Sequence, residues 1–168
     1  GLNEFITELD IKAPELKHVS PEFIVFGAND HHIGRFWIDK NGYFTASTNL
    51  NANNNVTVQW DGVVTADGTY KTGFSEATHK VVKTTPGKWY NVKVGINPST
   101  GAVRYYFENK LLTEYVNPGI TASTTIVEFR IRANDWADDT VTSVTEIDNV
   151  KFGWALGDAK IENVTGIT

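Results

Sequence analysis

The sequence predicts an all-β domain built as a two-sheet antiparallel sandwich. Short runs of residues alternate between apolar and polar with period two, and these runs are rich in Val, Ile, Thr and aromatic residues. Sequences typical of turns separate the runs, and helical periodicity is nearly absent. Strands with one apolar and one polar face bury the apolar face by packing two sheets together.

About ten strands are expected along the chain. They cover residues 4–12, 22–27, 33–38, 42–47, 55–60, 79–84, 88–97, 102–108, 125–133 and 144–154. The breaks between them contain turn-forming segments such as Lys40-Asn41-Gly42 and Asn117-Pro118-Gly119. Residues 157–168 form either a last strand or the start of a connection to another domain.

Length and composition limit the class of protein. The chain has 168 residues, of which 40% are hydrophobic, so we expect residues 1–168 to form a single domain with its own core. The net charge of −5 gives no general attraction to nucleic acid or to anionic membranes, and no apolar run approaches the roughly 18 residues of a membrane span. Cysteine is absent, which excludes disulfides and cysteine nucleophiles and is compatible with a secreted bacterial protein.

The alternation also assigns each side chain to a face of its strand. The side chains expected to face inward include Tyr90, Val92, Val94, Val103, Tyr105, Phe107, Val127, Phe129 and Ile131. The side chains expected to face outward are Arg35, Trp37, Tyr43, Asn91, Lys93, Arg104, Tyr106, Glu128, Arg130 and Arg132. A register error of one residue would exchange the two sets.

Three segments in the second half resemble the concanavalin A-like lectin and glucanase superfamily, which includes laminin G-like domains. They are WYNVKV at 89–94, VRYYF at 103–107 and IDNV at 147–150. The resemblance implies a jelly-roll sandwich of the kind found in carbohydrate-binding modules. It indicates fold better than function, because lectins, glycosidases, lyases and adhesins share this fold.

One motif tests whether the chain is an enzyme. Related β-glucanases carry a Glu-x-Asp-x-Glu motif whose three carboxylates share one face of a strand. Glu146 and Asp148 match its first two positions, but Val150 stands at the third, so the proton donor is missing. The run from Glu128 to Arg132 matches only part of the Arg-x-Glu-x-Arg pattern of lyases with this fold. We therefore expect no catalysis, with a glycoside hydrolase or polysaccharide lyase as the alternative.

Metal sites have few candidates in the sequence. Asp148 either hydrogen-bonds a loop or binds a structural calcium, because calcium prefers carboxylate and carbonyl oxygens. His31 and His32 are adjacent and point in opposite directions in an extended chain, which is poor geometry for zinc. The loop at 134–139, with Trp136, is a metal loop, a sugar-binding loop or a solvated turn. No organic cofactor is expected.

The outward set supplies the functional hypothesis, because its strands are expected to adjoin in one sheet and to form a single binding patch on the concave face of the sandwich. Trp and Tyr stack on sugar rings, whereas Arg, Asn and Glu bind sugar hydroxyls. Five of the ten outward residues are Arg or Lys in an acidic protein, which favours an anionic glycan such as a uronic-acid polymer. The alternative is a solvated face with Glu–Arg pairs, as in a structural or adhesive spacer. We predict a monomeric, non-catalytic polysaccharide-binding module of a larger secreted or cell-surface protein that is active on glycans.

Overall fold

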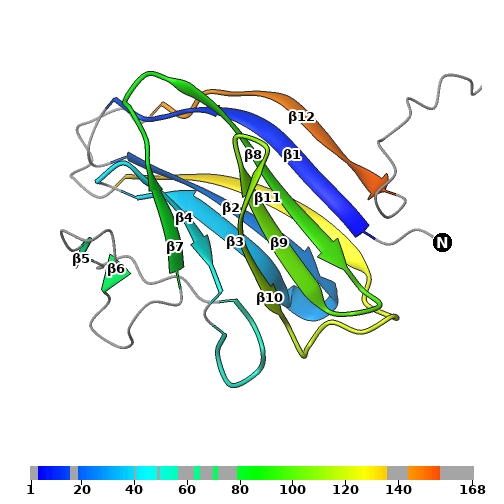
Figure 1. Cartoon of the computed structure of the whole chain (residues 1–168). Coiled ribbons are helices and arrows are strands. Elements are labelled where there is room, and N and C mark those ends of the chain that lie inside the picture. Colours follow the sequence, from blue (N-terminus) through cyan, green and yellow to red (C-terminus); the bar gives the residue numbers. More distant parts are fainter. Residues whose placement is uncertain are drawn as a thin grey trace, which may run out of the picture.

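The computed structural model describes residues 4–15, 19–39, 41–48, 50–56, 63–64, 70–71, 79–135 and 144–155. Two five-stranded antiparallel sheets pack face to face, and a separate two-stranded sheet accompanies them (Figure 1). The predicted all-β sandwich is confirmed. Among the described residues, no helix is long and apolar enough to cross a membrane.

The first sheet, sheet A, has the strand order β10-β9-β8-β1-β12. Its strands are β1 (Glu4–Lys12), β8 (Trp89–Asn97), β9 (Ala102–Phe107), β10 (Lys110–Val116) and β12 (Ile147–Ala155). The second sheet, sheet B, has the order β11-β2-β3-β4-β7. Its strands are β2 (Val19–Gly27), β3 (His32–Ile38), β4 (Tyr43–Ser47), β7 (His79–Lys83) and β11 (Ile126–Asp135). A 3₁₀ turn, η1 (Ala28–Asp30), joins β2 to β3, and the two-residue strands β5 (Val63–Val64) and β6 (Tyr70–Lys71) pair with each other.

The core lies between the sheets and consists of the apolar side chains predicted to face inward. Tyr90, Val92, Val94, Val103 and Tyr105 are buried there, and Phe107, Phe129 and Ile131 pack against them. Aromatic rings from sheet B fill the centre, where Phe23 stacks on Phe36 with 4.8 Å between ring centroids. Period-two alternation therefore identified the core faces of β8 and β9 correctly.

Val127 is an exception, because this predicted core residue is exposed. In the pairing of β11 with β2, Ile126 stands opposite Gly27 and Glu128 stands opposite Phe26. Val127 is thus the extra residue of a β-bulge and has no partner in the register.

Strand β10 was not predicted from the sequence. Its residues Leu111 and Leu112 break the alternation because Leu112 is the extra residue of a bulge against β9. The hairpin turn before it, Glu108-Asn109, has both residues at positive φ, without the glycine that usually signals such a turn. The strand expected at 55–60 is represented by Val56, which forms an isolated bridge with Leu50, and its other residues from 57 onward lie outside the described part.

Candidate functional site

The ten outward residues were expected to form one surface. In the structure they lie on two different sheets. Sheet A carries Asn91, Lys93, Arg104 and Tyr106. Sheet B carries Arg35, Trp37, Tyr43, Glu128, Arg130 and Arg132. Because the two sheets pack core to core, their outer faces lie on opposite sides of the molecule (Figure 1). The expectation of a single patch is therefore wrong, since alternation assigns a strand face but not the sheet to which the strand belongs.

The sheet A group is a network of cross-strand polar pairs. The Asn91 amide donates a 2.9 Å hydrogen bond to the Glu8 carboxylate. Lys93 lies 3.6 Å from Glu8, and Arg104 forms an ion pair with Glu114. Such pairs contribute roughly 0.2–1 kcal/mol each to a sheet. This face fits the solvated alternative considered above.

Trp37 is not an exposed aromatic platform. Its side chain is wholly buried, although it is not part of the core cluster between the sheets. Its register partners Glu22 and Thr45 are also wholly buried, so this part of the outer face of sheet B is covered in the folded chain. Tyr43 lies next to β7 at the far side of the sheet, where the ammonium group of Lys83 sits 4.4 Å from its ring centroid.

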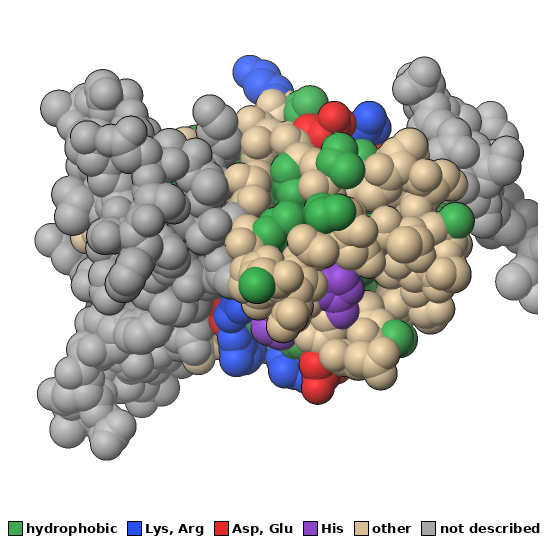
Figure 2. Space-filling view, turned by 90° about the horizontal axis from the view of Figure 1, so that it is seen from below, with side chains coloured by type: hydrophobic (Ala, Val, Ile, Leu, Met, Phe, Trp, Pro, Cys, Tyr) green, Lys and Arg blue, Asp and Glu red, His purple; other side chains and the backbone are tan. Residues whose placement is uncertain are grey.

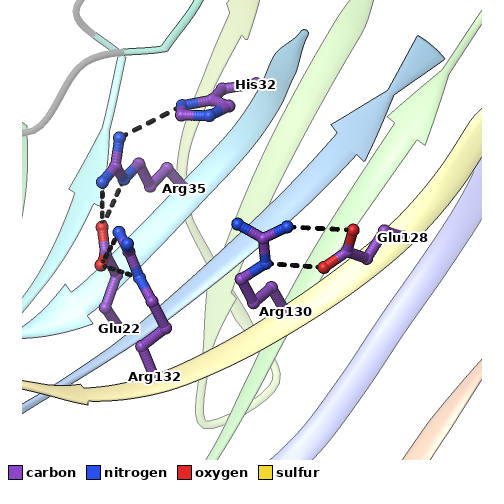
Figure 3. Close-up of polar contacts among 6 residues, drawn as sticks. All are labelled: Glu22, His32, Arg35, Glu128, Arg130 and Arg132. Atoms are coloured by element: carbon purple, nitrogen blue, oxygen red, sulfur yellow. Dashed lines mark hydrogen bonds and ion pairs between the residues drawn. The ribbon is translucent and has the colours of Figure 1, made fainter. Parts of the chain in front are cut away.

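A buried carboxylate organises the remaining sheet B residues. Glu22 in β2 forms ion pairs with Arg35 in β3 and with Arg132 in β11, two strands that flank β2 (Figure 3). The Arg132 Nε donates to Glu22 Oε2 over 2.9 Å. A buried carboxylate is costly unless it is paired and hydrogen-bonded, so Glu22 fixes the orientation of both guanidinium groups.

Sequence reasoning missed Glu22. It lies at the start of an apolar run, and the structure places every residue of β2 in a buried position. One feature of the sequence could have indicated its role. Glu22 is the single carboxylate of β2, a strand that is otherwise apolar apart from one serine, and it lies on the same face as Ile24 and Phe26. A charge in such a place requires a partner of opposite charge.

His32 joins this group because of a bulge in β3. Val25 pairs with Gly34 and Phe26 pairs with His32, so Ile33 is an extra residue in β3. Residues three apart in a regular strand face opposite sides, but the bulge brings His32 and Arg35 to the same face. From the sequence, His32 was considered only together with its neighbour His31 as a poor zinc pair, so it was not among the predicted site residues.

Arg35 and Phe26 both contact the His32 ring. Its Nδ1 lies 3.2 Å from Arg35 Nη1, and the ring meets Phe26 edge to face with 4.6 Å between centroids. Burial lowers the pKa of His32, and the positive charge of Arg35 lowers it further. The imidazole is therefore neutral at neutral pH. Burial also lowers the pKa of Arg35, an effect opposed by Glu22.

Arg130 and Glu128 form a two-bond ion pair on the exposed edge strand β11 (Figure 3). The Nε and Nη2 atoms of Arg130 donate to the two carboxylate oxygens over 2.6 and 3.1 Å. These bonds raise the pKa of Arg130 and lower that of Glu128. The guanidinium carbon also lies 4.4 Å from the Phe26 ring centroid. Arg130 is thus held in place while its side chain stays about half exposed.

We use the name arginine patch for the six residues Glu22, His32, Arg35, Glu128, Arg130 and Arg132. In the view of Figure 2, basic, acidic and histidine side chains gather along the lower rim of the described part, beside apolar side chains. Arg130 and Arg132 are two residues apart on one face of β11, a spacing of about 7 Å along the strand. A guanidinium has five N–H donors, so the bonds to Glu128 and Glu22 leave donors on both residues available to a ligand.

The candidate metal residue, Asp148, lies on the outer face of sheet A. It stands opposite Asp10 in β1 and accepts a 2.7 Å hydrogen bond from the backbone N–H of Asn149. A bulge at Asn149, whose φ is 51°, resets the alternation, so Val150 is not on the same face as Asp148. The expected placement of Val150 on the face of Glu146 and Asp148 is therefore wrong.

The surroundings of Asp148 contain no ready metal cluster. Among the described residues, no group of three His, Cys, Asp or Glu side chains is placed to hold a metal ion. Two amide hydrogen bonds, from Asn149 and Asn91, lower the pKa of Asp10. Glu146 forms a 2.8 Å ion pair with Lys12. The loop residues 136–139 lie outside the described part of the chain.

No protein-family model matches the sequence, and no curated protein is similar to it. Solved structures do share its fold. A sialidase matches with a TM-score of 0.56 and 14% identity, covering 90% of this chain and 13% of its own. A family 7 alginate lyase, A1-II′, solved with a substrate, matches with a TM-score of 0.54 and 12% identity, covering 95% of this chain and 64% of its own. Sheep galectin-11 matches with a TM-score of 0.46 and 11% identity over 89% of both chains.

The chain spans less than two thirds of the sialidase and of the lyase. At these identities the likeness concerns fold alone. Together with the two antiparallel sheets, the matches to the sialidase and the lyase show that the fold is a jelly-roll sandwich of the concanavalin A-like type. The resemblance stated from the three sequence segments is confirmed.

Proposed function

We propose that the protein binds carbohydrate through the arginine patch without transforming it. The observation that carries this proposal is the buried Glu22 carboxylate, which holds Arg35 and Arg132 in fixed orientations on one face. Planar guanidinium groups in fixed positions donate paired hydrogen bonds to carboxylates and hydroxyl groups. Arg130 and Arg132 present such donors on an accessible edge strand.

The charge of the patch supports an anionic glycan, such as a uronic-acid polymer. Three arginines face two carboxylates, and His32 is neutral, so the patch has an excess of one positive charge on a protein of net charge −5. Trp37 and Phe26 are buried, so hydrogen bonds and charge dominate recognition rather than stacking on exposed rings. Affinity should therefore decrease as salt is added.

A polysaccharide lyase is the second candidate, and His32 is the observation that favours it. A neutral imidazole beside arginines is suited to accept a proton from a bound uronate. Against this, His32 Nδ1 is held by Arg35, and both patch carboxylates are paired with arginine, so neither is a ready proton donor. We therefore favour binding, in an accessory module of a secreted or cell-surface bacterial protein active on glycans.

A glycan array that includes neutral and uronic-acid polymers tests the proposal. Arg130→Gln should weaken polyuronate binding about tenfold, because a hydrogen bond to a charged group contributes about 1.5–3 kcal/mol. Arg104→Gln is the matched control, since Arg104 forms a similarly exposed Glu pair on the opposite sheet. Equal binding by wild type and Arg130→Gln would contradict the proposed surface.

The same polymers, assayed for unsaturated products and for reducing ends, test the lyase alternative. We expect no cleavage. Cleavage that disappears in His32→Gln would establish the lyase and remove the proposal of a non-catalytic module.

We also propose that any bound calcium is structural, with Asp148 as a ligand. An ion that binds only the folded state raises its stability. Wild type should therefore melt at a higher temperature in calcium than in chelator, and Asp148→Asn should not show this difference. Identical melting temperatures for wild type would leave Asp148 with a hydrogen-bonding role only.

A further inference from the structure

An apolar groove opens between the edge strands β11 and β12 on one side of the sandwich. Its volume is about 420 Å³, and its walls include Phe5 and Phe152 from sheet A and Val127 and Phe129 from sheet B. Phe152 is 72% exposed and Val127 is 58% exposed, and Trp154 on the same strand as Phe152 is also exposed. Large contiguous apolar surfaces of this kind mark interaction sites.

The exposed side chains coincide with a free backbone edge. The N–H of Lys12 donates to the carbonyl of Glu146, so even-numbered residues of β1 direct their backbone groups toward β12. In the register of β1 and β12, those residues stand opposite Lys151 and Gly153. The backbone groups of Phe152 and Trp154 therefore point away from β1. In the described part of the chain, β12 ends sheet A and no strand pairs with that edge (Figure 1).

We propose that a second copy of this chain covers this edge, with β12 pairing antiparallel to β12 of the copy about a two-fold axis at Phe152. In this register Phe152 faces Phe152 of the copy, and Val150 faces Trp154. Lys151 faces Gly153, so no like charges stand directly opposite. The surface is thus complementary to itself, as an isologous two-fold interface requires.

The neighbouring symmetric registers are less favourable. An axis at Lys151 places two lysines directly opposite each other. An axis at Gly153 leaves Val150 facing residue 156, beyond the end of β12. Only the axis at Phe152 pairs all three exposed apolar residues of β12 within the strand.

The pairing would also close the groove. Val150, Phe152 and Trp154 lie on the core-facing side of β12, since Phe152 stands opposite Thr7 and Trp154 contacts the Phe5 ring. The same residues of the copy would extend that apolar surface alongside Val127. Lys151 stands opposite Glu8 in its own sheet, so an acidic side chain lies near it without the copy. The proposed dimer is an alternative to the monomer expected from the sequence.

Sedimentation equilibrium of residues 1–168 tests the proposal. Wild type should show a concentration-dependent dimer, and Phe152→Glu should raise the dimer dissociation constant at least tenfold while its circular dichroism spectrum stays that of a folded all-β protein. Leu111→Glu is the matched control, because Leu111 is 54% exposed on β10, the opposite edge strand of sheet A. That variant should dimerise like wild type. A monomer at all concentrations, or a dimer that Phe152→Glu leaves intact, would overturn the proposal.

A cysteine variant tests the register. The chain has no cysteine, so Phe152→Cys introduces a single thiol into each copy. Directly opposite residues of a hydrogen-bonded antiparallel pair lie about 5.5 Å apart at Cα, which a disulfide can span. Oxidation should give a covalent dimer with Phe152→Cys and not with Leu111→Cys. Failure of the Phe152→Cys protein to cross-link overturns the proposed pairing.

Discussion

The side-chain hydroxyl of Tyr105, in sheet A, accepts a 2.7 Å hydrogen bond from the backbone N–H of Arg35, in sheet B. Tyr105 is wholly buried, and burial raises the pKa of its hydroxyl. The contact crosses the core at the β3 bulge, beside Gly34, which packs closely against the opposite sheet. A Cβ at Gly34 would lie only 3.3 Å from the Val94 side chain. The backbone that carries Arg35 is therefore tied to the opposite sheet.

Tyr105→Phe should destabilise the protein by about 1–3 kcal/mol, because it leaves the buried N–H of Arg35 without its acceptor. Urea unfolding of wild type and variant measures the difference. Tyr43→Phe is a suitable control, since Tyr43 lies near the edge of sheet B and is partly exposed. Equal stability of wild type and Tyr105→Phe would mean that another group takes over the bond.

Glu22→Gln should be more damaging. It removes the charge that compensates Arg35 and Arg132, and removing one partner of a buried ion pair costs about 3–5 kcal/mol. Glu128→Gln is the matched control, because the Glu128–Arg130 pair is exposed and should contribute little to stability. A Glu22→Gln variant as stable as Glu128→Gln would show that Glu22 is accessible to water.

Trp37→Ala should lower stability by about 3–5 kcal/mol, as expected for a large buried aromatic side chain. The sequence-based expectation was the opposite, an exposed platform whose removal leaves the melting temperature nearly unchanged. Arg130→Ala should still leave the melting temperature nearly unchanged, because the Arg130 side chain is about half exposed. Thermal melts of the two variants side by side separate these roles. Equal melting temperatures for both would contradict the burial of Trp37.

The fold was largely predictable because alternation depends on neighbours in sequence. The core residues of β8 and β9 follow from period two alone. The strand predictions that were wrong or missing lie at bulges, at Val127 in β11 and at Leu112 in β10. One extra residue there breaks the alternation between inward and outward side chains. A bulge has no clear sequence signature when no glycine marks it.

The site was less predictable because it depends on strand order. Arg35, Arg130 and Arg132 were correctly assigned outward, but nothing local indicates that β11 and β3 flank β2. The same order separates Asn91 and Lys93 from them, although all were expected on one surface. The residue that holds the group together, Glu22, lies in a strand that otherwise reads as core.

The titration of His32 gives a pH-dependent prediction. In the folded state its pKa is depressed below its ordinary value of 6.5, chiefly by burial and then by Arg35. The unfolded chain therefore binds the proton more readily, and stability should fall as pH decreases through about 6.5 toward the folded-state pKa. Above that range His32 is neutral in both states and contributes no pH dependence.

Melting temperatures of wild type and His32→Gln between about pH 5 and pH 8 measure this effect. The difference between the two proteins isolates His32 from carboxyl groups such as Glu4, whose pKa burial raises above its usual 4.5. Wild type should lose more stability than His32→Gln on acidification, because only wild type has a partly buried imidazole whose protonation Arg35 opposes. Parallel curves for the two proteins would mean that His32 is protonated equally in the folded and unfolded states.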